Sequence, residues 1–157
     1  MNDQWMEPDT TEATEFIDKV PAPEKAEGYV MMIKSMPKFK LASTGVPYLE
    51  WFFVHTGENA KYSAVFERTM MAGKGAFRHF GILNALGYTN EQIKASFKYR
   101  ALAPLTDENK KEGVACELSI GGEKITPMGR TVLAVLKIET GNDGIDRSAI
   151  KSVKKVA

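Results

Sequence analysis

The 157-residue sequence predicts a mainly β fold in which three strands, a helical insert and two more strands follow one another. The first observation is residues 28–69, where three runs rich in β-branched and aromatic residues are separated by two clusters of turn formers. The second is residues 76–97, whose apolar spacing and capping signals are helical. The third is a pair of strand-like apolar runs at 114–120 and 131–139. The predicted order is therefore β-β-β-α-β-β.

The first strand covers residues 28–34 and extends past Pro37 into residues 38–41. Because proline cannot donate to a ladder, we expect this strand to be bent or bulged, as in small closed barrels. The second strand, 48–55, alternates between two faces. Leu49, Trp51 and Phe53 share one face, and Glu50 indicates that the opposite face meets solvent or a ligand.

The third strand, 61–69, places Tyr62, Phe66 and Arg68 on one side. The sequence does not determine which side of this strand faces the core. A helix is expected from residue 76 to about 86, with Gly87 just beyond its end. A second helix begins at Thr89, where Thr-x-x-Gln forms a capping box. Residues 100–113 are predicted to be a polar loop.

Five strands in this order, with a helical insert after the third, are typical of the OB-fold. This fold is a five-stranded Greek-key barrel that binds oligonucleotides across its second and third strands. An SH3-like barrel and a small β-sandwich are the alternatives.

Charge divides the chain into three parts. Residues 1–27 hold eight acidic residues against two lysines and are predicted to form an acidic mobile arm. Residues 28–140 form the predicted domain, with a charge of +5, and residues 141–157 a basic tail with +2. A basic body suits a polyanionic partner, with the acidic arm either competing for the same surface or keeping the protein soluble.

Composition argues against several classes of function. The lone Cys116 cannot form an internal disulfide, which favours a reducing compartment, and the two histidines have no close metal-ligand spacing. The chain has no zinc-protease, dithiol or serine-hydrolase motif, so we expect no metal, no cofactor and no enzymatic activity. Without a signal peptide or a long apolar run, the protein is expected in the cytoplasm, without membrane association.

Eight of the fifteen aromatic residues lie in residues 28–69, interleaved with cations. Aromatic rings that stack bases beside a cationic groove are typical of single-strand nucleic-acid binders. The residues predicted to stack on bases are Phe39, Tyr48, Phe52 and Tyr62. Those predicted to contact phosphates are Lys34, Lys38, Lys40, Arg68, Lys74 and Arg78. Three further aromatic residues are interpreted as barrel core: Trp51, Phe53 and Phe66.

Three segments also resemble a family of small phage-encoded proteins with an OB-fold. They are GYVMMIK, STGVPYLEWFFVHTGENAKYSAVFE and GKGAFRHFGILNALGY, and the match spans roughly residues 28–97. The resemblance implies non-catalytic, single-stranded DNA binding in phage replication, recombination or repair, with phage or host replication and recombination proteins as partners. Family members often carry an acidic C-terminal tail, whereas here the acids are N-terminal and the C-terminus is basic.

A second hypothesis treats the aromatic residues as a protein interface in a structural or phage-assembly module. A stable homo-oligomer that does not bind nucleic acid would favour it. The sequence leaves open the oligomeric state and the preference between DNA and RNA.

Overall fold

The computed structural model describes Met6 and residues 19–156. Within these residues the chain is mainly β, with nine antiparallel strands, two α-helices and two 3-10 helices. The strands are β1 (Tyr29–Ile33), β2 (Lys38–Leu41), β3 (Pro47–His55), β4 (Val65–Met70), β5 (Lys98–Ala101), β6 (Val114–Ile120), β7 (Glu123–Ile125), β8 (Thr131–Thr140) and β9 (Asp146–Lys154). The helices are η1 (Gly57–Lys61), η2 (Lys74–Phe77), α1 (Arg78–Ala85) and α2 (Asn90–Ser96).

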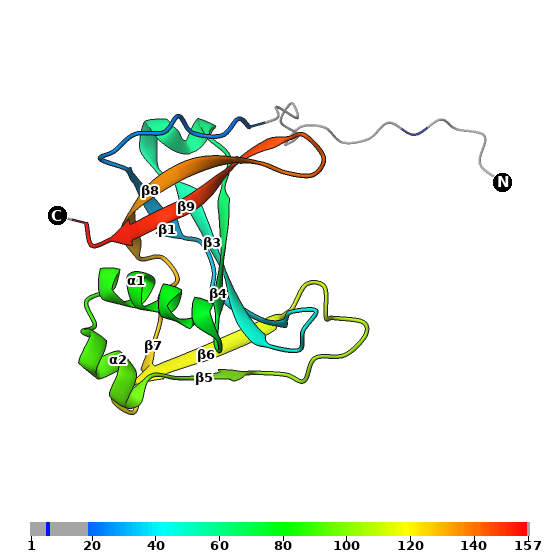
Figure 1. Ribbon diagram of the computed structural model, residues 1–157, viewed down its shortest axis with the longest axis vertical. Coiled ribbons are helices and arrows are strands. Elements are labelled where there is room, and N and C mark those ends of the chain that lie inside the picture. Colours follow the sequence, from blue (N-terminus) through cyan, green and yellow to red (C-terminus); the bar gives the residue numbers. More distant parts are fainter. Residues whose placement is uncertain (1–5, 7–18, 157) are drawn as a thin grey trace.

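Strand β3 is the centre of the sheet. One of its edges pairs with β4, and the other pairs first with β2 and then with β1. From β1 the sheet continues to β8 and β9, and β9 lies against β4. From β2 it continues to β6, which also pairs with β5 and β7. Figure 1 shows the resulting two parts, with α1 between the β8–β9 hairpin and the lobe of β5, β6, β7 and α2.

The predicted bend in the first strand is confirmed. The chain leaves the ladder between Ile33 and Lys38, and the two segments become β1 and β2, which pair with successive parts of β3. The carbonyl of Pro37 accepts a hydrogen bond from the Cys116 amide at 3.2 Å. One bent segment therefore joins strands β1 and β3 to the β5–β6–β7 lobe.

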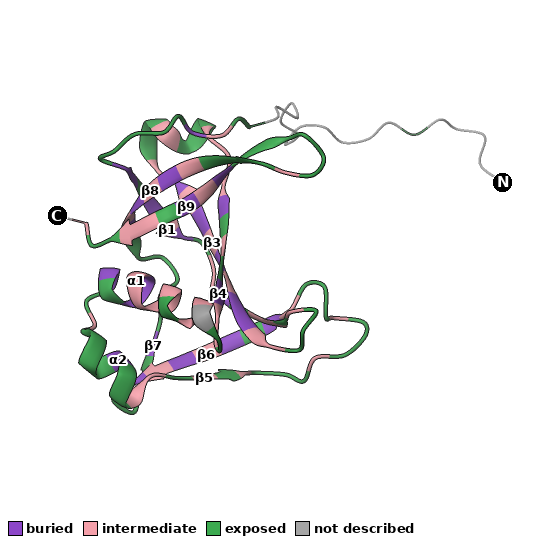
Figure 2. Cartoon of the chain, viewed as in Figure 1, coloured by how far each residue is buried: buried purple, intermediate pink, exposed green. Residues whose placement is uncertain are grey.

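The predicted faces of the second strand are also confirmed. Leu49, Trp51 and Phe53 are fully buried in a core that also includes Ile82 and Leu83 of α1 (Figure 2). The Trp51 indole donates a hydrogen bond of 2.9 Å to Thr69 Oγ1, so the one polar atom of this large side chain is satisfied inside the core.

The helical insert follows the sequence signals closely. Gly87 has φ +106°, the left-handed conformation expected just beyond a helix. At Thr89, the hydroxyl accepts from the Gln92 amide at 3.1 Å, and the Gln92 side chain accepts from the Thr89 amide at 2.8 Å. The predicted capping box is therefore present and begins α2.

The predicted five-strand count is wrong, because the described residues contain β5, β7 and β9 in addition. The 114–120 strand, β6, pairs with β2, β5 and β7, away from the β1–β8–β9 ladders. Strand β5 is only four residues long and lies partly in the predicted 100–113 loop. Gly121 and Gly122, both at positive φ, make the expected tight turn, but the returning strand β7 ends at Ile125.

The third strand begins later than predicted. Residues Gly57–Lys61 form the 3-10 helix η1, and β4 starts only at Val65. Between them, Tyr62 makes an isolated parallel bridge with Val20, and the Ser63 amide donates to the Val20 carbonyl at 2.9 Å.

The predicted boundaries at both ends also need correction. Residues 146–154 of the expected basic tail form β9, which pairs with β8 and buries Ser148 and Ile150. Three cations on β9 obscured its alternation in the sequence. Of the expected arm, residues 1–27, the part from 19 to 27 packs on the sheet: Ala22 is buried and its amide donates to Ser148 Oγ at 3.0 Å. Residues 1–5 and 7–18 lie outside the described residues.

None of the helices in the described residues is long and apolar enough to cross a membrane.

Candidate nucleic-acid interface

The outward surface of β2, β3 and β4, together with the residue just after β1, carries five exposed or half-buried aromatic and cationic side chains. We call it the aromatic–cationic face and define it by Lys34, Lys38, Phe52, Phe66 and Arg68. Because side chains alternate along a strand, Phe52 points away from the side that carries Trp51 and Phe53, and Phe66 points away from the side that carries Val65. Both rings therefore point away from the core. The aromatic–cationic face therefore lies on the outer side of the sheet, and the inner side of its central strand β3 carries the fully buried residues.

Phe52 and Phe66 are directly opposite each other in the β3–β4 ladder. Their ring centroids are 4.6 Å apart with 20° between the ring planes, and Phe66 is 62% exposed. Such an offset stack of two rings is favourable in itself, yet it leaves one ring open to solvent. An exposed, pre-positioned aromatic surface can accept a flat ligand such as a nucleobase.

Three cations lie on the same face as this pair, in its own row across the sheet or in the next one. The Lys34 amide donates to the Phe52 carbonyl at 2.9 Å, which places Lys34 beside Phe52 on the neighbouring strand. In the next row, Lys38 of β2 lies opposite Glu50, and Glu50 lies opposite Arg68 of β4. Lys34, Lys38 and Arg68 are all exposed, so their charges are available to an anion.

Tyr48 and Lys40 share the surface, but both are already engaged. The Arg68 guanidinium lies 4.4 Å from the centre of the Tyr48 ring and leaves Tyr48 only 7% exposed. The Lys40 ammonium is 3.0 Å from Glu50 Oε1, and its side chain is 13% exposed. Tyr48 therefore supports Arg68 rather than offering a free ring, and Lys40 neutralises Glu50.

Phe39 lies on the opposite side of the sheet, packed against the core. Its ring stacks with Tyr99 at 6.2 Å, and the series continues to Phe97 at 6.4 Å and from Phe97 to His79 at 5.3 Å. The flanking lysines made Phe39 look like a surface residue, but strand alternation turns its side chain inward while theirs turn outward. Phe39, which was predicted to stack on bases, therefore lies on the other side of the sheet from Phe52 and Phe66.

Tyr62 is also remote from the face. Its ring makes edge contacts with Tyr29 at 6.0 Å and His55 at 5.6 Å, under the segment that includes Val20. Because Tyr62 precedes β4 instead of belonging to it, the alternation that relates it to Phe66 and Arg68 does not apply.

Arg78 lies between α1 and strands β4 and β9. Its Nη2 donates to Glu67 Oε2 at 2.8 Å and to the Ile150 carbonyl at 3.2 Å. Arg78 therefore connects α1 to β4 and β9 and does not join the aromatic–cationic face. Lys74 is the first residue of η2, and its side chain lies outside what the structure describes.

Phe66 is the functional candidate that sequence reasoning missed, since it was interpreted as core. The available signal was Arg68 two residues further along the strand: a charged side chain at i+2 indicates that Phe66 shares the outward face. Trp51 and Phe53, interpreted in the same way, are indeed buried.

Groups that could serve catalysis are dispersed. Among the described residues there is no cluster of three or more His, Cys, Asp or Glu side chains able to hold a metal ion. Cys116 is buried in the core, and burial raises the pKa of its thiol to about 11. Burial, together with the charge of Lys19, lowers the pKa of His55, and burial also lowers the pKa of His79.

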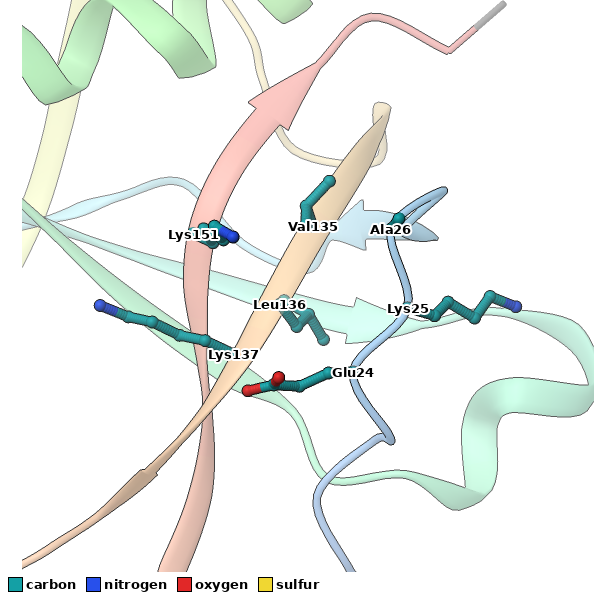
Figure 3. A pocket seen from close by; sticks show the side chains of 7 residues that line it. All are labelled: Glu24, Lys25, Ala26, Val135, Leu136, Lys137 and Lys151. Carbon is teal, nitrogen blue, oxygen red and sulfur yellow. The ribbon is translucent and has the colours of Figure 1, made fainter.

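A hollow of about 370 Å³ lies between residues 24–26 and strand β8. Glu24 Oε1 accepts a hydrogen bond from the Ile138 amide at 2.9 Å, which covers the β8 edge where β1 no longer pairs with it. In Figure 3, the side chains of Lys25 and Lys137 extend in opposite directions. The ammonium groups of Lys25 and Lys137 therefore do not converge on the hollow, which is open to solvent.

In comparisons with known proteins, no protein-family profile matches the chain and no curated protein sequence matches it.

Proposed function

We propose that this protein binds single-stranded DNA through the aromatic–cationic face, largely independently of sequence and without catalysis. The observation that carries the proposal is the stacked Phe52–Phe66 pair, which is open on one side and lies among Lys34, Lys38 and Arg68. Stacking on an aromatic ring tolerates any base and contributes about 1–3 kcal/mol per base, while the cations attract phosphates. The rings and the cations together therefore match the bases and the phosphates of a single strand.

We further propose that the barrel part is an OB-fold. The ladders β4–β3, β3–β1, β1–β8 and β8–β9, with β9 against β4, are the neighbours expected of a five-stranded, partly open Greek-key barrel. The helical insert follows the third of these strands, and α1 packs on β4, β8 and β9. In this proposal β3 and β4 are the second and third strands, whose outer surface is the usual oligonucleotide face of the fold.

The face is better suited to an unpaired strand than to a duplex. In a duplex, base faces are stacked on one another, so rings such as Phe66 have no base to contact. From the resemblance to phage-encoded proteins, we propose that the activity serves phage DNA replication, recombination or repair, with proteins of those processes as partners.

The test is fluorescence anisotropy of a labelled oligo-dT at two salt concentrations, with duplex DNA and RNA of matched length as competitors. We expect tight binding to the single strand that weakens steeply with salt, because bound cations release counterions from the phosphates. Weak competition by the duplex is also expected. Absence of binding at low salt would overturn the proposal and favour a protein interface, which a stable homo-oligomer would support.

A further inference from the structure

The β5–β6–β7 lobe continues the outer surface of the barrel. Lys38 of β2 lies opposite Glu50 of β3 on one side and opposite Ala115 of β6 on the other. Side chains of directly opposed residues project from the same side of a sheet. The row that begins at Arg68 therefore passes through Glu50 and Lys38 to Ala115 without a break in the sheet.

Cations gather on this outer side of the lobe. Lys98 and Arg100 are the exposed residues of β5, and Lys124 of β7 lies opposite Ser119. We call Lys98, Arg100 and Lys124 the lobe strip. Arg100 Nη2 and Lys124 Nζ lie 2.6 and 3.0 Å from the two carboxylate oxygens of Glu117, yet their own side chains are 73% and 67% exposed.

One carboxylate among three cations leaves the lobe strip with a net positive charge. A shallow hollow of about 290 Å³ lies beside it, lined by Lys98, Arg100, Glu117 and Ser119 among others. Tyr99 alternates to the inner side of β5, where it stacks on Phe39, so the strip offers charge without an outward ring. Its chemistry suits a phosphate backbone rather than bases.

Spacing connects the two surfaces. Neighbouring strands are about 4.8 Å apart, so Arg68 and Lys38, two strands apart, are separated by about 10 Å. Arg100 lies two strands beyond Lys38, with β6 between them. Its partner on β6, Glu117, is two residues along that strand from Ala115, the partner of Lys38. Exposed cations therefore occur at intervals of two strands from β4 to β5, with Glu50 and Ala115 on the strands between them.

We infer that the lobe strip is a second, purely electrostatic subsite that holds the phosphates of a single strand after it leaves the aromatic–cationic face. The inference rests on the proposed function. It predicts that long strands bind more tightly than short ones and that the difference comes from charge rather than stacking. A short oligonucleotide fills the aromatic–cationic face alone, whereas a long one reaches both surfaces.

The test compares the K98Q/R100Q/K124Q variant with the unmodified protein, using anisotropy of oligo-dT of about 8 and about 30 nucleotides, one length within the site sizes of OB-folds and one beyond them. A matched control, K94Q/K111Q/K154Q, removes the same charge from exposed lysines on α2, the 102–113 loop and β9. Thermal unfolding midpoints establish that all three proteins are folded.

We expect the lobe-strip variant to bind the short strand within about twofold of the unmodified protein and the long strand at least tenfold more weakly. Its salt dependence with the long strand should fall by about 2 in the slope of log K against log salt, since each lost phosphate contact removes about 0.7. The control variant should keep both affinities within about threefold.

Equal long-strand affinity and salt slope in the lobe-strip variant and the unmodified protein would overturn the inference while leaving the proposed function in place. An equal loss for both variants would also overturn it, because net charge alone would then explain the effect. If the unmodified protein binds neither length, the proposed function fails and this inference fails with it.

Discussion

The Arg78 guanidinium donates a hydrogen bond of 2.8 Å to the Glu67 carboxylate and thereby joins α1 to β4. The same nitrogen donates to the Ile150 carbonyl of β9 at 3.2 Å. Strands β4 and β9 lie against each other, but no ladder joins them in the described chain. Arg78 therefore links two strands that lack backbone hydrogen bonds to one another.

This link predicts a loss of stability without a loss of binding. Arg78→Ala should lower the free energy of unfolding by about 1–2 kcal/mol, an amount moderated by the partial exposure of the arginine side chain. Denaturant unfolding followed by tryptophan fluorescence measures it, and Arg78→Lys should recover part of the loss. A large drop in single-strand affinity of the folded variant would instead restore the phosphate-contact role predicted from the sequence.

Replacing Phe66 should affect binding more than folding. Phe66→Ala removes an exposed ring, so we expect single-strand affinity to fall about 5- to 150-fold, the equivalent of about 1–3 kcal/mol. Stability should fall by only about 1 kcal/mol, from loss of the stack on Phe52. The matched control is Phe77→Ala, because Phe77 is 67% exposed but belongs to η2. Comparable losses of affinity in both variants would contradict the placement of the site.

Gly28 should tolerate no side chain. Its φ is +75°, and a Cβ there would lie 2.7 Å from the Ala134 carbonyl oxygen of the adjacent strand β8. Gly28→Ala therefore combines backbone strain with a clash against backbone, and we expect it to cost more than about 2 kcal/mol. Gly45→Ala is the control, since Gly45 has φ +86° with no atom within 4 Å of the added Cβ and should show the strain alone, about 1–2 kcal/mol. Thermal unfolding measures both variants, and equal midpoints would contradict the predicted clash at Gly28.

Stability should decrease as the pH falls below about 6.5. His55 is buried between Tyr29 and Tyr62, and neither of its ring nitrogens has a hydrogen-bond partner among the described residues. Burial, and then the charge of Lys19, lower the pKa of His55 in the folded state, while in the unfolded chain it stays near 6.5. Below that pH the unfolded state binds more protons than the folded one, so the free energy of unfolding declines.

Denaturant unfolding at pH 7.5 and 5.5 measures this effect. His55→Phe keeps an aromatic ring between the two tyrosines and removes the titration, so its loss of stability over the same interval should be smaller. His79, whose pKa burial also lowers, should account for part of the remaining decline. An identical pH dependence in the variant and the unmodified protein would exclude His55 as a source.

Local signals were sufficient where an element depends mainly on its own residues. The alternation of Leu49, Trp51 and Phe53 identified the buried face of β3, and the pair Thr89 and Gln92 marked the start of α2. Pro37 likewise indicated the interruption between β1 and β2, since a residue without an N–H cannot continue a ladder.

Partner-dependent elements escaped the sequence analysis. Strands β5 and β7 are four and three residues long, too short for a periodic pattern, and both are stabilised by pairing with β6. Strand β9 was hidden by its cations, because a strand that buries Ser148 and Ile150 and packs Val153 against the core needs few apolar residues.

The sequence by itself determined that this protein is mainly β, where its central buried strand lies, and that aromatic rings and cations are concentrated around that strand. Only the tertiary structure decided which of them meet. Phe66 was brought to Phe52 by strand pairing, while Phe39, Tyr62 and Arg78 were directed to separate environments. The physical reason is that alternation gives the two faces of a strand, whereas the identity of the neighbour across the sheet depends on register and on long-range packing.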